Sequence, residues 1–118
     1  MPNYKYSHEH LVSPNPEKTA DFYIKMFGAK KDRVVKRPSG GVSIFLNLDG
    51  TTIVISEKSQ PPFGLDHFGI ATDNLDLTVK ELKAAGYKFT MEITAIGPKT
   101  RIAFFQGPDN ALIELVEE

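Results

Sequence analysis

The sequence contains no cysteine among its 118 residues. Disulfide bonds, thiolate zinc sites and cysteine nucleophiles are therefore excluded, and any metal ion would depend on imidazole and carboxylate ligands. Imidazoles are scarce as well, because the only histidines are His8, His10 and His67. The chain also lacks a phosphate-binding loop and a Gly-x-Ser-x-Gly nucleophile elbow, so no organic cofactor is indicated.

An excess of charge of either sign is also missing, since 14 Lys and Arg stand against 15 Asp and Glu. Nucleic acid phosphates and anionic lipids attract proteins with a clear cationic excess, so we expect neither as a partner. The longest apolar runs are a few residues long, far below the roughly 20 residues that cross a bilayer. Residues 1–10 do not resemble a secretory signal, and we expect a soluble, cytoplasmic protein.

A chain of this length suits one domain, because it buries roughly two-thirds of the surface of its unfolded state. Within that domain, residues 1–118, the expected elements occur in the same order twice. Residues 4–57 predict a first module with a strand at 4–12, a helix at 16–27 and strands at 33–36, 41–48 and 51–56. Residues 58–64 form a polar connector with two prolines. Residues 65–118 predict a second module with a strand at 65–71, a helix at 75–85 and strands at 88–92, 101–106 and 111–117. The fold class is therefore α+β, with two tandem βαβββ modules.

Both expected helices carry start and stop signals. These signals are Asn15, Pro16 and Gly28 in the first module and Asp73, Asn74 and Gly86 in the second. Apolar residues at helical spacing predict that the first helix lies on a sheet through Ala20, Phe22, Tyr23, Met26 and Phe27. The dipeptide Asp49-Gly50 between two strand-like segments is typical of a β-hairpin turn.

The two modules can be aligned with each other. His8 and His67 lie 59 positions apart, and residues 53–57 match 113–117 at a spacing of 60. A unit of this size cannot bury a core alone, so the two repeats are expected to pack into one structure.

Several motifs together resemble the vicinal oxygen chelate superfamily. They are His8 on the first strand, the Phe22-Tyr23 helix ending in Phe27-Gly28, the segment Leu65-Asp-His-Phe-Gly-Ile70 and the closing segment Gly107-Pro-Asp-Asn-Ala-Leu-Ile-Glu-Leu-Val116. This superfamily includes glyoxalase I, methylmalonyl-CoA epimerase, extradiol dioxygenases, fosfomycin-resistance enzymes and bleomycin-resistance proteins. The resemblance implies a cupped mixed sheet around a divalent metal, often in a homodimer.

The resemblance also implies a set of metal ligands on the first and last strands of each module. In this sequence those positions hold His8, His67 and Glu114, while the fourth position falls on Val54. Valine cannot bind a metal. Glyoxalase I and the epimerases of the family usually have a protein ligand there, whereas its fosfomycin-resistance and extradiol enzymes use two His and one Glu. The departure at Val54 therefore places dioxygenase or addition chemistry ahead of glyoxalase-type isomerisation.

Two imidazoles and one carboxylate suit Fe(II), Mn(II), Zn(II), Ni(II) or Co(II) and leave positions open for substrate. The alternative is that His8 and His67 are ordinary strand residues and that Glu114 is an exposed polar residue. Glu114 shares a strand face with apolar Leu112 and Val116, where an unpaired carboxylate would be costly to bury. The matching positions of the two histidines favour the metal site.

His10 follows His8 on the same strand face and could be a ligand, a base or a hydrogen-bonded core residue. Because internal matching pairs His10 with Gly69, we favour His8 as the ligand and predict His10 as the catalytic general acid/base.

Other residues could line a substrate pocket. For the aromatic pairs Tyr4/Tyr6 and Phe104/Phe105, core packing is the favoured interpretation. Lys99 and Arg101 could bind an anionic substrate, although solvated loop charges are the favoured interpretation. Glu117 and Glu118 are interpreted as solvated terminal charges.

The leading hypothesis is a small metal-dependent enzyme that acts on a small oxygen-chelating substrate, with the metal as Lewis acid. Dioxygenase, lyase, isomerase and transferase chemistry all stay open. The alternative is a metal-free protein of the bleomycin-resistance type that sequesters a small molecule, and a third possibility is a domain whose chemistry has been lost.

Overall fold

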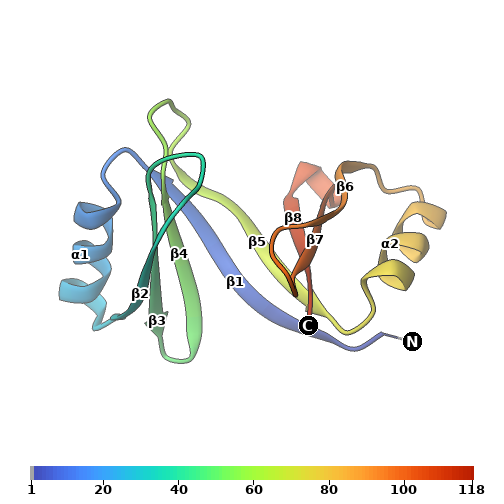
Figure 1. The fold of residues 1–118 in the computed structure, drawn as a ribbon, viewed down its shortest axis with the longest axis horizontal. Helices are drawn as coiled ribbons and strands as arrows, with labels where there is room; N and C mark the ends of the chain where they lie inside the picture. Colours follow the sequence, from blue (N-terminus) through green and yellow to red (C-terminus); the bar gives the residue numbers. More distant parts are fainter. Residues whose placement is uncertain (1) are drawn as a thin grey trace. The chain divides into compact units, whose positions relative to one another are not determined.

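Residues 2–118, which the computed structural model describes, form eight strands and two α-helices in the predicted order (Figure 1). The first module contains β1 (Tyr4–Ser13), α1 (Pro16–Phe27), β2 (Lys30–Lys36), β3 (Val42–Leu48) and β4 (Thr51–Glu57). The second contains β5 (Gly64–Thr72), α2 (Leu75–Ala84), β6 (Phe89–Ala95), β7 (Arg101–Gln106) and β8 (Leu112–Glu117), with a short 3-10 helix, η1 (Pro108–Asn110), before β8. The α+β class with two βαβββ modules is confirmed.

The chain packs as two compact units. The N-terminal unit comprises residues 8–66, and the C-terminal unit comprises residues 2–7 and 67–118. Residues 4–7 of β1 therefore belong to the C-terminal unit, although the sequence repeat assigns them to the first module. The single domain predicted over residues 1–118 stays a prediction, and Met1 lies outside the described residues.

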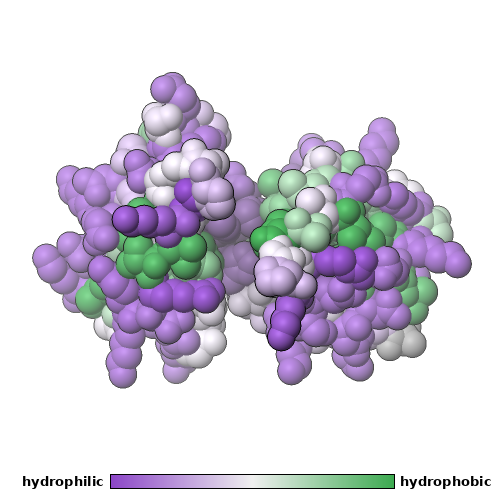
Figure 2. Space-filling model, viewed as in Figure 1, coloured by the Kyte–Doolittle hydropathy of each residue, from purple (hydrophilic) through white to green (hydrophobic). Residues whose placement is uncertain are grey.

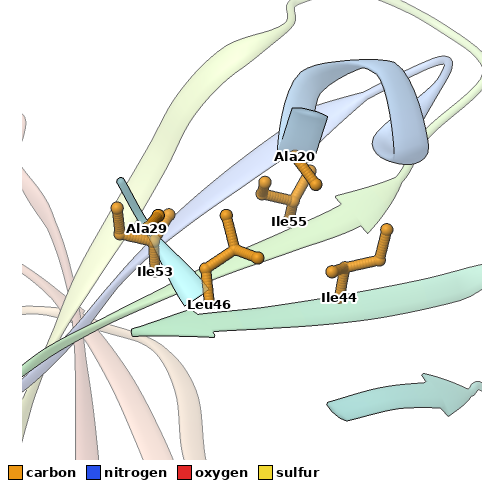
Figure 3. Close-up of a cluster of buried hydrophobic side chains, with 6 residues drawn as sticks. All are labelled: Ala20, Ala29, Ile44, Leu46, Ile53 and Ile55. Atoms are coloured by element: carbon orange, nitrogen blue, oxygen red, sulfur yellow. The ribbon is translucent and has the colours of Figure 1, made fainter. Parts of the chain in front are cut away.

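In the N-terminal unit, the strand order is β2-β3-β4-β1. β1 and β4 are parallel, whereas the other neighbours are antiparallel. One face of this sheet packs against α1 through a buried cluster (Figure 3) of Ala20, Ala29, Ile44, Leu46, Ile53 and Ile55. Because side chains alternate along a strand, Val54 and Ser56 lie on the opposite face of β4 from Ile53 and Ile55.

The C-terminal unit repeats this arrangement with the order β5-β8-β7-β6. β5 and β8 are parallel, and the remaining pairs are antiparallel. Its core joins α2 to the sheet through Leu75, Val79, Ala103, Phe105, Ile113 and Leu115. Phe105 is thus a core residue, as predicted.

Strand pairing follows the same register in both units. His10 is the partner of Val54 in one, and Gly69 is the partner of Glu114 in the other. The next strand of each sheet pairs in the same way: Phe45 on β3 is the partner of Val54 on β4, and Phe104 on β7 is the partner of Glu114 on β8. The modules are therefore related position by position, at spacings of 59 and 60 residues, as the sequence repeat predicts.

The predicted capping residues are confirmed at the start of each helix. The Asn15 side chain accepts a hydrogen bond from the Lys18 amide, and Asn74 accepts one from the Leu77 amide. Asp49 and Gly50 both have positive φ, which a two-residue hairpin turn requires.

The apolar face predicted for α1 is only partly correct. Ala20 is buried and Tyr23 packs beside the core, but Phe22, Met26 and Phe27 are more than half exposed. On the helix, the Phe22 ring makes edge-to-face contacts with the rings of Tyr23 and Phe27. Hydrophilic residues otherwise cover much of the visible face of each unit (Figure 2). Among the described residues, no helix combines the length and apolar character that crossing a membrane requires.

Candidate functional site

A buried histidine–carboxylate pair lies in the sheet of the C-terminal unit. His67 on β5 and Glu114 on β8 are 7% and 8% exposed, and Nε2 of His67 lies 3.0 Å from Oε1 of Glu114. An unpaired carboxylate would be costly to bury, and this contact with His67 gives the buried Glu114 a partner. The exposed-residue alternative for Glu114 is wrong.

The separation within this pair also suits a metal site. Two metal–ligand bonds of about 2.1 Å at roughly a right angle place their donor atoms about 3 Å apart. The imidazole nitrogen and the carboxylate oxygen are both donor types that borderline divalent ions accept. His67 and Glu114 therefore fit two adjacent positions of a metal coordination shell.

Phe104 on β7 covers the His67 ring. The two ring centroids are 4.9 Å apart with an interplanar angle of 82°, which is an edge-to-face contact. Phe104 is only half-buried, and its strand neighbour Phe105 points to the core on the other face. The prediction of core packing is thus correct for Phe105 but wrong for Phe104, which belongs to the surroundings of His67.

His8 and His10 lie on β1 in the N-terminal unit, and both are half-buried. Their ring centroids are 6.0 Å apart in an edge-to-face arrangement. Nε2 of His10 lies 2.7 Å from Oγ of Ser56 on β4, and Oγ of Ser56 lies 2.7 Å from Oγ of Ser43 on β3. His10 is therefore hydrogen-bonded through one ring nitrogen to a chain of two buried hydroxyls.

The two serines were missed from the sequence. Ser43 and Ser56 are 7% and 2% exposed, although serine in a strand is usually an exposed residue. A signal existed, because a two-residue Asp49-Gly50 hairpin places Ser43 directly opposite Ser56.

Val54 occupies the position in the N-terminal unit that Glu114 occupies in the C-terminal unit. It is 3% exposed and lies between His10 and Phe45 in strand pairing. The predicted asymmetry between the modules is therefore a buried valine against a buried, paired carboxylate.

Arg101 is engaged in ion pairs within the C-terminal unit. Its guanidinium donates from Nε and Nη2 to the Glu117 carboxylate and from Nη2 to Asp76. Hydrogen bonds from Arg101 lower the pKa of both carboxyl groups, and the two carboxylates raise the pKa of Arg101. Glu117 also accepts a hydrogen bond from the Leu75 amide at the start of α2.

These contacts correct two interpretations of charged residues. Glu117 is not a solvated terminal charge, because it joins β8 to β7 and to α2. Arg101 is neither a solvated loop charge nor available to an anionic substrate while both carboxylates hold its guanidinium. Lys99 is exposed in the loop before β7, as the favoured interpretation stated.

Tyr4 and Tyr6 are not core residues, contrary to prediction. They are 50% and 56% exposed in the C-terminal unit. The Tyr4 hydroxyl lies 3.4 Å from the Thr78 hydroxyl on α2, and the Tyr6 ring stacks on Phe68 at 6.2 Å. Both tyrosines thus cover the surface of this unit.

Three comparisons with known proteins agree on a family. The mitochondrial methylmalonyl-CoA epimerase of Homo sapiens is 27% identical over 126 residues, covering 96% of this chain and 72% of the epimerase. A hypothetical protein from Bacillus halodurans C-125 has the same fold, with a TM-score of 0.84, 20% identity and coverage of 98% of this chain and 95% of that chain. Methylmalonyl-CoA epimerase from Mycobacterium tuberculosis matches with a TM-score of 0.78, 17% identity and coverage of 95% and 86%.

The family model for the Glyoxalase/Bleomycin resistance protein/Dioxygenase superfamily matches residues 5–115, nearly the whole chain. The relative from Homo sapiens is an enzyme, in agreement with the prediction of an enzyme. Together with the paired βαβββ modules, this match shows that the chain belongs to the Glyoxalase/Bleomycin resistance protein/Dioxygenase superfamily.

Proposed function

We propose that this protein is a metal-dependent enzyme that transfers a proton at a carbon next to a carbonyl group, in a small substrate that chelates through adjacent oxygens. The observation that carries the proposal is the buried His67–Glu114 pair. A carboxylate and an imidazole removed from water at ligand spacing are costly to maintain, and a metal ion would make use of both.

His8, His67 and Glu114 would hold the ion, which is expected to be Fe(II), Mn(II), Zn(II), Ni(II) or Co(II). Support for His8 comes from the repeat, because it matches His67 and precedes the strand pair His10–Val54 as His67 precedes Gly69–Glu114. A bound divalent ion would supply Lewis acidity at the substrate carbonyl. Val54 adds no ligand, so the protein would contribute three donors and leave positions for the substrate.

His10 would act as the general acid/base. Imidazole is the side chain best suited to proton transfer near neutral pH. Its ring is held at Nε2 by Ser56. Phe104 would shield the His67 side of the site from water, since its ring covers that imidazole.

Proton transfer is proposed in place of the dioxygenase or addition chemistry that Val54 alone favoured. The relatives that match most of the chain are named as epimerases, and an epimerase must remove and return a proton. The relatives support the class of reaction. Because their names include methylmalonyl-CoA, this thioester is the first substrate to test.

The test is exchange of the proton next to the carbonyl of methylmalonyl-CoA in D2O, followed by mass spectrometry. We expect exchange with protein loaded with Mn(II) or Co(II), no exchange after metal removal with a chelator, and no exchange by His67→Ala. Glu92→Gln is the matched control, because it removes an exposed carboxylate that pairs with Lys83 and should leave exchange unchanged.

Two outcomes contradict the proposal. One is exchange of equal rate in metal-free and metal-loaded protein. The other is no exchange by metal-loaded protein with methylmalonyl-CoA or with a panel of small thioesters and 2-hydroxy ketones. If no metal binds and a small aromatic or cationic compound does, the bleomycin-resistance type of binding protein becomes the better assignment.

A homodimer is part of the proposal and rests on the family resemblance. Sedimentation equilibrium is expected to give twice the chain mass, and a monomer at all concentrations would contradict this expectation.

A further inference from the structure

We propose that Arg33 binds an anionic group of the substrate, a carboxylate or a phosphate, on the sheet of the N-terminal unit. Arg33 lies on β2, the outermost strand in the order β2-β3-β4-β1 (Figure 1). Its side chain is exposed, and its Cζ lies 4.1 Å from the centroid of the half-buried Phe45 ring, which is a cation–π contact. Because Phe45 belongs to β3, the guanidinium leans over the sheet and away from its open edge.

A one-residue register shift, as in a β-bulge, decides which face of the sheet Arg33 occupies. The shift lies between Lys31 and Arg33. Lys31 faces α1, where its ammonium pairs with Glu17, and in a regular strand the residue two positions later would face α1 as well. The extra residue reverses this alternation, so Arg33 pairs with Phe45 on the face opposite the α1 core.

A row of paired residues connects Arg33 to the predicted site. Arg33 pairs with Phe45, and Phe45 pairs with Val54. Val54 in turn pairs with His10 on β1. Neighbouring strands are about 4.8 Å apart, so a guanidinium above β3 lies about 10 Å from β1. The substrate is therefore an elongated molecule whose anionic group is several bonds away from its chelating oxygens, an assignment that rests on the proposed function.

The charges on this face favour an anion. Among the described residues 2–118, no carboxylate forms an ion pair with Arg33. The paired positions of β1, β3 and β4 on the same face hold histidine, hydroxyl, amide and apolar side chains, and none of them holds a carboxylate. Lys30 adds a second cation to this face, because it pairs with Asn47, two residues after Phe45. The planar guanidinium suits a bidentate contact with a carboxylate or phosphate.

The second module has no cation at the position of Arg33. Its strand β6 shows a register shift at the same place, between Phe89 and Met91, and Met91 is the partner of Phe104 as Arg33 is the partner of Phe45. The irregular strand is thus common to both modules, whereas the arginine belongs to the first module alone.

The experiment is NMR of the arginine Nε–Hε groups of ¹⁵N-labelled, metal-free protein at constant ionic strength. Inorganic phosphate and glutarate are titrated separately, which distinguishes a phosphate from a carboxylate as the preferred group. At least one of them should move the Arg33 resonance saturably. Arg33→Gln, followed through the backbone amides of β2 and β3, should weaken this binding about tenfold. Arg33→Lys should weaken it less, because it keeps the charge and loses the planar fork.

Lys36→Gln is the matched control. Lys36 is a cation of the same strand, and its partner Val42 packs against the α1 core, so Lys36 lies on the opposite face. This variant should bind both anions as tightly as wild type. An Arg33 resonance that neither anion moves, or a loss of affinity in Lys36→Gln equal to that in Arg33→Gln, overturns the proposal.

Metal content and kinetics separate the role of Arg33 from the proposed function. Arg33→Gln should bind as much metal as wild type and raise the KM for methylmalonyl-CoA, which carries carboxylate and phosphate groups, about tenfold at unchanged kcat. Wild-type protein that binds no metal would contradict the proposed function, even if its anion binding depends on Arg33. Metal-dependent exchange with the same KM in wild type and Arg33→Gln would instead overturn the role of Arg33 and leave the proposed function intact.

Discussion

The two modules share one backbone register but differ in the polar groups that they bury. The first buries two serines beside His10 and has Val54 at the position that matches Glu114. The second has Gly69 at the position of His10, and it buries Glu114 against His67. A duplicated fold thus keeps the same strand pairing while its halves carry different chemical groups.

The same contrast extends to the strand ends, where β7 begins and β8 ends. Arg101 on β7 pairs with Glu117 on β8, whereas the residues at the matching spacings in the N-terminal unit are Val42 and Glu57. The C-terminal unit therefore ties its last strand to its helix by charge, and the matching position of the N-terminal unit has no arginine.

The largest expected effect comes from removing the partner of the buried carboxylate. In metal-free protein, His67→Ala should lower the free energy of unfolding by about 3 kcal/mol, because Glu114 stays buried without that imidazole. His8→Ala, at a half-buried position, should cost about 1 kcal/mol or less. Urea unfolding in the presence of a chelator measures both. Equal decreases in the free energy of unfolding for His67→Ala and His8→Ala would contradict a special role of His67 as the partner of the buried carboxylate.

Val54→Glu gives the first module the carboxylate of the second. The position is 3% exposed, so the substitution should cost about 2 kcal/mol in metal-free protein. If the position faces the metal site, added Mn(II) or Zn(II) should raise the melting temperature of this variant more than that of wild type. Val54→Gln, with similar size and no charge, is the control. A melting temperature of Val54→Glu that metal does not raise would place Val54 outside the coordination shell.

The helix N-caps are equivalent in the two modules, so removing either cap should lower the stability by a similar amount. Asn15→Ala and Asn74→Ala each remove a side-chain cap from a helix N-terminus and should cost about 1 kcal/mol each. Thermal unfolding measures both. A difference of more than about 1 kcal/mol between the two variants would argue against equivalent helix contributions.

The smallest effect concerns the arginine of the second module. Hydrogen bonds from Arg101 lower the pKa of Glu117 and Asp76 in the folded state, so their stabilisation is complete above the ordinary carboxyl pKa. It is lost as pH falls through the lowered folded-state values. Arg101→Gln should therefore reduce the urea midpoint at pH 7 more than at pH 2, and Lys83→Gln, in an exposed pair with Glu92, should change it little at either pH. A deficit of Arg101→Gln that does not shrink in acid would contradict the ion-pair role.

Local signals were sufficient to predict the elements of this fold. Capping residues such as Asn15 and Asn74 act within one helical turn, so their effect can be seen in the sequence. The strand β2 was predicted too short, because Lys30, Lys31 and Asp32 show no apolar alternation. Pairing with β3, across a register shift between Lys31 and Arg33, extends it.

Contacts between distant segments were less predictable. Tyr4 and Tyr6 were assigned to a core because the pattern could not show that residues 4–7 join the C-terminal unit. Glu117 was taken for a solvated charge because its partner Arg101 lies on another strand. The pairing of His10 with Ser56 likewise depends on the parallel alignment of β1 and β4, which no local turn determines.

Metal content per chain tests the central claim most directly. Protein purified without chelator, supplied with Fe(II), Mn(II), Zn(II), Ni(II) or Co(II) and then dialysed, should retain a stoichiometric amount of one of these ions by elemental analysis. His10→Ala should retain it as well, whereas His8→Ala and His67→Ala should lose it. Wild-type protein that retains none of the five metals, or metal that is lost from His10→Ala and kept by His8→Ala, would contradict the ligand set His8, His67 and Glu114.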